Sequence, residues 1–430
     1  MARARRRKKA GRAATALSFA LTLTACDQFG AVAKPEVPLW ANHPGTALSV
    51  DARRELSTKQ FDAGEPYERG VPALDTAHRR VFVGSSDRGL YALSAATLAT
   101  LWRFQTGGAV QGQPLYVQQE DAVYVGSNDG AVYKLRASDG AMIWRFATNA
   151  EVVRQPVLAG KTLFAMNAND TLVAIDKDSG KLRWFRQRTP AFGMEIAGYA
   201  GPAVHDRMVF AAFSDGAVMA YRVDDGSEAW TTIADLTAEA EQTAAGNELR
   251  YLDVDTTPVI AHLGGETMLF VASYEGGIFA LDPKSGGQLW RNEKASGVTD
   301  LTLWTGATRA ASSATGDSAG LAPTSPAQTS VLVASSGLTG LWGLKPTDGA
   351  PLWRRELPAG GATAAVPWAG ALLFGTSRYG LFLVHPLDGS VLDGLAAGGS
   401  FAAAPAAQGR RAFALTNDGV VMALGIEPPQ

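Results

Sequence analysis

Two aspartates stand out as residues whose spacing could serve chemistry. They lie in Asp253-Val-Asp255-Thr-Thr-Pro-Val259, and alternate residues of an extended strand point to the same side. Two such carboxylates could bind a metal ion, act as an acid–base pair, hold a basic residue of a partner, or accept hydrogen bonds from neighbouring backbone. Only His262 lies near them, and the five histidines are scattered without metal-ligand spacing. We therefore predict no metal site and no catalytic residue.

The single cysteine, Cys26, is the second candidate. It follows a basic segment and an apolar stretch, residues 13–25, which is too short to span a bilayer and is typical of a signal peptide over residues 1–25. Leu23-Thr-Ala-Cys26 resembles the lipobox of bacterial lipoprotein precursors, which implies cleavage before Cys26 and lipidation of this residue. The alternative is an ordinary signal peptide with a chance cysteine. One cysteine also rules out disulfides within the chain.

The charge balance argues against a nucleic-acid partner. Residues 1–25 carry seven basic and no acidic side chains, so their removal changes the formal net charge from −2 to −9. An acidic surface repels a phosphate backbone. No other segment of the sequence is long and apolar enough to cross a membrane. The lipid would then be the sole membrane anchor, joined to the fold by a tether over residues 26–36.

The elements that position these residues repeat along the chain. The unit is an apolar strand, a tight turn, a second apolar strand, an Asp-Gly turn and a strand that ends in tryptophan, and Val123–Trp144 is its clearest copy. The other copies begin near Val81, Leu163, Val209, Leu269, Val331, Leu372 and Ala412. Eight copies of roughly 40 residues predict an all-β fold, an eight-bladed β-propeller with one repeat per blade.

A turn glycine and a tryptophan recur together in this unit. In five of six copies the tryptophan follows the glycine by four residues: Trp144, Trp184, Trp230, Trp290 and Trp353. A large ring at a fixed place can wedge between blades and bury about 200 Å², so we predict core residues rather than a cofactor cage. Asp393 replaces the tryptophan in the seventh copy, and the first copy lacks the glycine but keeps Trp102.

The two ends of the chain are predicted to meet. The last copy lacks its tryptophan strand, and Val37–Trp40 could supply it, which would leave no unpaired sheet edge along the seam. The propeller then covers residues 37–427, with residues 41–70 as a long polar connection. Wider spacing between tryptophans locates two inserted loops, an acidic one near residues 234–251 and one of small polar residues at 307–330.

The mature chain resembles the BamB family, lipoprotein propellers of the machinery that assembles β-barrel proteins in the outer membrane. The resemblance rests on the lipobox, the eight repeats, the closing strand, the seventh repeat without tryptophan, and Asp253-Val-Asp-Thr-Thr-Pro258 after an acidic insertion. The repeats that end at Trp184 and Trp290 also resemble the tryptophan-docking motif of quinoprotein (PQQ-type) propellers.

The resemblance implies a non-catalytic scaffold that needs no cofactor. It would dock to the periplasmic POTRA domains of the subunit BamA, assist the insertion of β-barrel proteins, and contact their unfolded forms. The family residues implicated in docking are two aspartates, matched by Asp253 and Asp255, and a Leu-x-Leu-Arg-Gly loop. The loop aligns with Met194-Glu-Ile-Ala-Gly198, which keeps the apolar positions as Met194 and Ile196 and replaces the arginine by Ala197.

The resemblance also implies a cellular location, and it leaves two alternatives for the function. A lipid on Cys26 would hold the protein at the periplasmic face of the outer membrane, although Asp27 at the next position favours the inner membrane in enteric bacteria. A quinoprotein dehydrogenase would share the blade pattern, but such enzymes typically carry a vicinal cysteine pair, which this sequence lacks. A propeller that binds other envelope proteins or polymers is the second alternative.

Cys26→Ala removes the predicted lipid attachment site. We expect the variant to take up no fatty-acid label and, once released from its signal peptide, to be recovered in the soluble fraction. Metabolic labelling with a palmitate analogue, followed by carbonate extraction of membranes, measures both properties against the wild type. A labelled variant, or an unlabelled one that resists carbonate extraction, would contradict this assignment.

Overall fold

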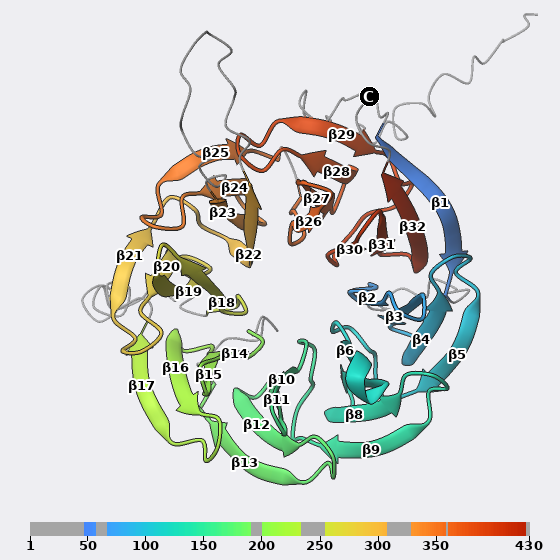
Figure 1. Cartoon of the computed structure of the whole chain (residues 1–430), viewed down its shortest axis with the longest axis horizontal. Helices are drawn as coiled ribbons and strands as arrows, with labels where there is room; N and C mark the ends of the chain where they lie inside the picture. Colours follow the sequence, from blue (N-terminus) through green and yellow to red (C-terminus); the bar gives the residue numbers. More distant parts are fainter. Residues whose placement is uncertain are drawn as a thin grey trace, which may run out of the picture. The chain divides into compact units, whose positions relative to one another are not determined.

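Eight four-stranded antiparallel sheets surround a common axis in the described part of the chain, and each corresponds to one copy of the sequence repeat (Figure 1). The computed structural model describes residues 47–56, 67–190, 200–233, 254–307, 328–357 and 360–426, all within one compact unit, Val37–Gln430. The predicted all-β, eight-bladed propeller is confirmed.

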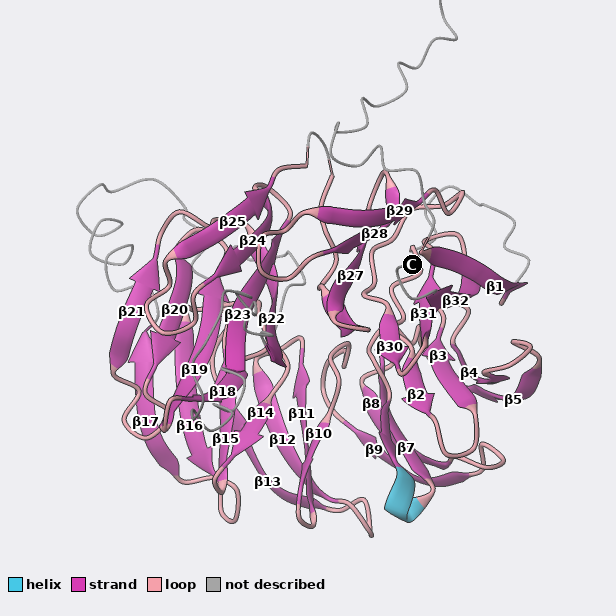
Figure 2. Ribbon diagram, turned by 45° about the horizontal axis from the view of Figure 1, so that its top comes forward, coloured by secondary structure: helices cyan, strands magenta, loops and turns pink. Residues whose placement is uncertain are grey.

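The first four blades follow the chain from the axis outward. The first blade contains β2 (Ala73–Asp75), β3 (Arg80–Gly84), β4 (Gly89–Ser94) and β5 (Thr100–Gln105). The second contains β6 (Leu115–Val117), β7 (Ala122–Ser127), β8 (Ala131–Arg136) and β9 (Met142–Ala147), with one 3₁₀ turn at Gln118–Glu120 (Figure 2). The third contains β10 (Val157–Ala159), β11 (Thr162–Asn167), β12 (Thr171–Asp176) and β13 (Leu182–Gln187). The fourth contains β14 (Ala203–His205), β15 (Met208–Ala212), β16 (Ala217–Arg222) and β17 (Glu228–Ile233).

The remaining blades complete the ring. The fifth contains β18 (Val259–Leu263), β19 (Glu266–Ser273), β20 (Gly277–Leu281) and β21 (Gln288–Asn292). The sixth contains β22 (Val298–Ala307), β23 (Gln328–Ser336), β24 (Gly340–Leu344) and β25 (Pro351–Arg355). The seventh contains β26 (Val366–Trp368), β27 (Ala371–Thr376), β28 (Gly380–Val384) and β29 (Val391–Leu395). The eighth contains β30 (Ala406–Gln408), β31 (Arg411–Leu415), β32 (Val420–Ile426) and β1 (Leu48–Glu55).

Burial within a blade follows from its two neighbours. The second and third strands face a blade on each side, so they are almost continuous apolar runs, and every residue of β11 is buried. The outer strands face solvent on one side and alternate. In β9, Trp144 is buried between exposed residues. The sequence period thus places one large aromatic ring of each regular outer strand against the next blade.

These tryptophans join neighbouring blades. The indole Nε1 of Trp144 donates to the carbonyl oxygen of Lys177 in the next blade at 3.0 Å, and the equivalent bonds are made by Trp102, Trp184, Trp230, Trp290 and Trp353. The ring also lies on the turn glycine of that blade. A Cβ on Gly180 would lie 2.8 Å from the Trp144 ring, and Gly180 has a φ of +71°, so only glycine suits this position. The predicted core role of the tryptophans is confirmed.

The ring closes through an N-terminal strand, but not through the predicted one. β1 pairs antiparallel with β32 and completes the eighth sheet. The assignment of this place to Val37–Trp40 is wrong, and those residues lie outside the described part of the chain. Residues 41–70 contain β1 and are therefore more than a polar connection. The sequence was misleading because Trp40 matches the repeat, whereas the strand that closes the ring carries no tryptophan.

In the seventh blade Asp393 replaces the tryptophan, because the eighth blade has no glycine turn on which a tryptophan could dock. The third and outer strands of the eighth blade come from opposite ends of the chain, so no glycine turn joins them. Instead, the buried carboxylate of Asp393 accepts hydrogen bonds from the backbone N–H groups of Ala47 and Leu48, at 2.7 and 2.6 Å. It satisfies the amides where the closing strand begins.

At the contact between the eighth and first blades, the large side chain lies in the turn and the small one on the outer strand. This is the reverse of the arrangement in the regular blades. Ala52 pairs with Ala423 in the register that Trp102 has with Ala92. Leu98 stands where the turn glycine stands in other blades, with a φ of +58° and the same turn hydrogen bond at 2.8 Å. Leu98 is fully buried in one cluster with Ala52. A large turn residue and a small strand residue therefore fill the space that tryptophan and glycine fill elsewhere.

Several predicted segments lie outside the described residues. These are the signal peptide 1–25, the tether 26–36 and the insertion near 234–251. Of the insertion at 307–330, both ends belong to strands, because β22 extends to Ala307 and β23 begins at Gln328. The described part of the chain contains no helix with the length and hydrophobicity of a membrane-spanning segment.

Ala52→Trp and Leu98→Gly should each destabilise the protein, and together they should partly compensate. Leu98→Gly alone leaves a cavity, which costs about 2–5 kcal/mol. Ala52→Trp alone overpacks against Leu98, at about 1–3 kcal/mol. The double variant rebuilds the tryptophan–glycine contact, so a double-mutant cycle should show a favourable coupling of about 1 kcal/mol or more. Chemical denaturation gives the free energies of unfolding, and strictly additive losses would exclude the exchange.

Candidate functional site

The antiparallel order of the strands sorts the loops onto two rims of the ring. Connections between blades, and turns between the second and third strands of a blade, lie on one rim, which we call the connection rim. The other turns lie on the opposite rim. The segment that contains Asp255 joins β17 to β18 and so belongs to the connection rim. Loops on a rigid scaffold are common places for binding sites.

The residues around Asp255 are firmly anchored. Val254 is buried in the core cluster between the fourth and fifth blades. The hydroxyl of buried Thr256 accepts from the N–H of Ala272 at 2.7 Å and lies 3.3 Å from the carbonyl oxygen of the same residue. Thr257 Oγ1 accepts from the N–H of Gly201 at 2.9 Å. Of the predicted alternation, the described residues contain Val254, which is turned into the core, and Asp255, which is half-buried.

Arg154 links this segment to the sixth blade. Its Nη2 donates to the backbone oxygen of Asp255 at 3.2 Å, and its Nη1 lies 3.8 Å from Oδ1 of Asp300. The first contact fixes the backbone on which the Asp255 carboxylate stands. The second is an ion pair longer than a hydrogen bond.

Of the four predicted partner-binding residues, the described part of the chain contains only Asp255. Asp253, Met194 and Ile196 lie outside it, as do Ala197, Cys26 and Asp27, so their predicted roles stay predictions. The insertion that precedes Asp253 also lies outside.

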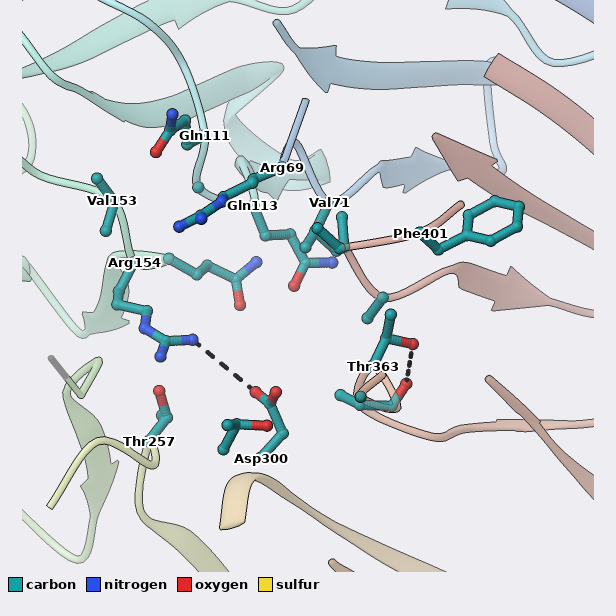
Figure 3. A pocket seen from close by; sticks show the side chains of 18 of the residues that line it. Arg69, Val71, Gln111, Gln113, Val153, Arg154, Thr257, Asp300, Thr363 and Phe401 are labelled. Carbon is teal, nitrogen blue, oxygen red and sulfur yellow. Dashed lines mark hydrogen bonds and ion pairs between the residues drawn. The ribbon is translucent and has the colours of Figure 1, made fainter. Parts of the chain in front are cut away.

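The axis holds a pocket of about 620 Å³ that sequence reasoning missed (Figure 3). Its lining comes from all eight blades and includes Arg69, Arg154, Thr257, Asp300 and Thr363. In Figure 3, the side chains of Arg69 and Arg154 point into the pocket, and Asp300 faces Arg154. The pocket therefore brings charged groups from the first, third and sixth blades together at the end of the axis where Asp255 is anchored.

A sequence signal for this pocket does exist. Proline directly precedes the innermost strand in six blades: Pro72, Pro114, Pro156, Pro202, Pro258 and Pro405. The residues beside these prolines line the axis, and the amides of Gln113 and Gln155 donate to the carbonyl oxygens of Pro72 and Pro114 at 3.0 and 3.1 Å. The residues next to each proline were thus identifiable as axial. Their chemistry in three dimensions was not, because it depends on which blades face each other.

Burial in the pocket raises the pKa of the Asp300 carboxyl above its usual value. About a third of the side chain is accessible, 35%, but the pocket walls surround it, so loss of hydration dominates. Attraction to Arg154 and a hydrogen bond from Thr299 act in the opposite direction. The negative charge on Asp300 is therefore disfavoured by its position and depends on Arg154.

The family model described as outer membrane protein assembly factor BamB matches residues 88–321, more than half of the chain. A protein of that description from Legionella pneumophila (strain Paris) is 25% identical over 228 residues, which is 53% of this chain and 50% of the relative. One from Yersinia pestis is 26% identical over 149 residues, 34% of this chain and 35% of the relative. The chain thus spans about half the length of the first relative and about a third of the second.

Solved structures show the same fold at lower identity. BamB from Moraxella catarrhalis superposes with a TM-score of 0.64 at 18% identity, covering 90% of this chain and 99% of that one. Quinohemoprotein alcohol dehydrogenase from Comamonas testosteroni gives a TM-score of 0.61 at 12% identity, covering 89% and 78%. At these identities the likeness concerns the fold alone.

Arg154→Met should raise the pKa of Asp300 further, because it removes the positive charge that favours the ionised carboxylate. Carboxyl ¹³C NMR titration of aspartate-labelled protein measures this shift. Arg207→Met is the matched control, since Arg207 is exposed and paired with Asp224. An Asp300 pKa that is unchanged by Arg154→Met, or that lies at or below the usual aspartate value in the wild type, would contradict the pocket electrostatics.

Proposed function

The chain belongs to the family of outer membrane protein assembly factor BamB, and on this premise we propose that it is a non-catalytic scaffold of the machinery that assembles β-barrel proteins in the outer membrane. The observation that carries the proposal is the family match over residues 88–321, which includes Asp255 and the anchoring contacts around it. The partner implied by the resemblance is the set of periplasmic POTRA domains of a BamA-like subunit, with unfolded outer-membrane proteins as further partners.

The docking surface proposed is the part of the connection rim around Asp255. Its backbone is held by the Thr256 hydroxyl on one side and by Arg154 on the other, so little conformational freedom is lost when a partner binds. Asp253 and Asp255 would together bind a basic side chain, because charge-assisted hydrogen bonds add orientation to attraction. Met194 and Ile196 would exclude water around these bonds. Ala197, in place of the family arginine, would remove one contact.

The lipid on Cys26 completes the proposal by setting the location. It would anchor the protein at the periplasmic face of the outer membrane and bring the propeller close to the assembly machinery. Asp27 makes the inner membrane the alternative address, and fractionation of the two membranes separates the two.

Replacing both carboxylates should weaken partner binding by about 2–5 kcal/mol, because it leaves the partner's basic group without its charge partner. The measurement is a calorimetric titration of the Asp253→Ala/Asp255→Ala variant with soluble POTRA domains. Met194→Glu/Ile196→Glu tests the apolar part. Asp178→Ala/Asp224→Ala is the matched control, since both carboxylates are exposed in turns of the opposite rim.

Circular dichroism establishes that each variant is folded. Wild-type affinity in both folded variants of the proposed surface would reject that surface. Failure of the wild type to bind POTRA domains would reject the scaffold function itself.

A further inference from the structure

The axial pocket has the charge distribution of a ligand site as well as the size of one. Its volume of about 620 Å³ lies within the roughly 300–1,000 Å³ that is usual for small-molecule pockets. Guanidinium groups line one part, and small residues of the seventh and eighth blades line another, namely Ala362, Ala364 and 402–404. We propose that this pocket binds a small organic oxyanion, with its carboxylate or phosphate group against Arg69 and Arg154 and a compact apolar part against the alanines.

Arg69 is held at the pocket by its neighbour. Glu68 is fully buried, where its carboxylate accepts from Ser85 Oγ at 2.8 Å and from the N–H of Ser86 at 2.7 Å. The N–H of Glu68 donates to the carbonyl oxygen of Asn417 in the eighth blade at 3.1 Å. Consecutive side chains of an extended segment point in opposite directions, so the burial of Glu68 turns Arg69 towards the axis (Figure 3).

Arg69 forms no ion pair with another described residue, although it lines the pocket and is exposed to it. A guanidinium presents a rigid fork of donors that matches the two oxygens of a carboxylate or phosphate. An incoming oxyanion would therefore displace no counter-charge of the described residues from Arg69.

Arg154 supplies the second cation. The bond to the backbone oxygen of Asp255 orients its guanidinium, whereas Asp300 lies 3.8 Å away. A ligand oxygen at hydrogen-bonding distance would approach more closely than Asp300 does. Because burial disfavours the charge on Asp300, this carboxylate is a weak competitor for Arg154.

Two acidic side chains line the pocket, Asp300 and Glu151. Their negative charges disfavour a bound anion. They also allow a test in which the sign of the removed charge determines whether binding weakens or strengthens. Variants that remove a positive charge must weaken binding, and variants that remove a negative charge must strengthen it. A pocket that binds through its apolar surface alone would show neither trend.

The test is a calorimetric titration of the full-length mature protein with phthalate and phenyl phosphate, which carry the two candidate anionic groups on one apolar ring. Benzyl alcohol and inorganic phosphate are the corresponding half-ligands. We expect at least one ring-bearing anion to bind more tightly than both half-ligands. Arg69→Gln and Arg154→Gln should each weaken its binding about tenfold, the loss expected for one charged hydrogen bond. Asp300→Asn and Glu151→Gln should tighten it.

Arg207→Gln is the matched control, and it should leave the affinity unchanged because Arg207 lies on the opposite rim. Absence of binding by both ring-bearing anions, or equal affinity in the wild type and both pocket arginine variants, would overturn the proposal. Inorganic phosphate that binds as tightly as the ring-bearing anions would overturn its apolar part. The experiment uses no partner protein, so its outcome is independent of the proposed docking function.

Discussion

The docking of a tryptophan of one blade on a turn glycine of the next is the contact on which the ring depends. This contact needs a large aromatic side chain on an outer strand and a turn residue without a side chain, and the repeat supplies both six times. A closed ring adds a constraint, because the last blade must be built from both ends of the chain. There the pattern changes in a coordinated way: Asp393 binds the free amides where β1 begins, and Leu98 fills the space beside Ala52. The irregular seventh and first copies of the repeat therefore lie on the two sides of the eighth blade, where the ring closes.

Closure of the ring also brings together the residues of the two surfaces that we propose to be functional. Eight innermost strands bring residues from distant parts of the sequence to one axis, where Arg69 of the first blade lies with Asp300 of the sixth. The same rim carries the anchored segment of Asp255, and Arg154 takes part in both places. The proposed docking surface and the proposed small-molecule pocket thus lie at one end of a rigid scaffold and share Arg154.

The sequence allowed the fold to be predicted because the repeat encodes it locally. The spacing from turn glycine to Trp144 or Trp184 reflects a contact whose two halves recur in every regular blade. The closing strand could not be located in this way, because the repeat predicts a tryptophan at this place and the closing strand has Ala52 there. The pocket was missed for a different reason. Arg69, Arg154 and Asp300 are unremarkable in sequence, and they become a site only through the order of blades around the axis. Asp255 could be identified from the sequence, because its alternation with Val254 and the resemblance of its segment to the BamB family both indicated a binding residue.

In the proposed function the connection rim, rather than the opposite rim, contacts the barrel-assembly machinery. Site-specific photo-crosslinking in intact cells tests it most directly, with the crosslinker at Glu275 or at Lys284. Both residues are exposed turn residues of the fifth blade, on the connection rim and the opposite rim respectively. We expect a crosslink to the BamA-like subunit from position 275 and none from position 284. A crosslink from position 284 without one from position 275 would contradict it.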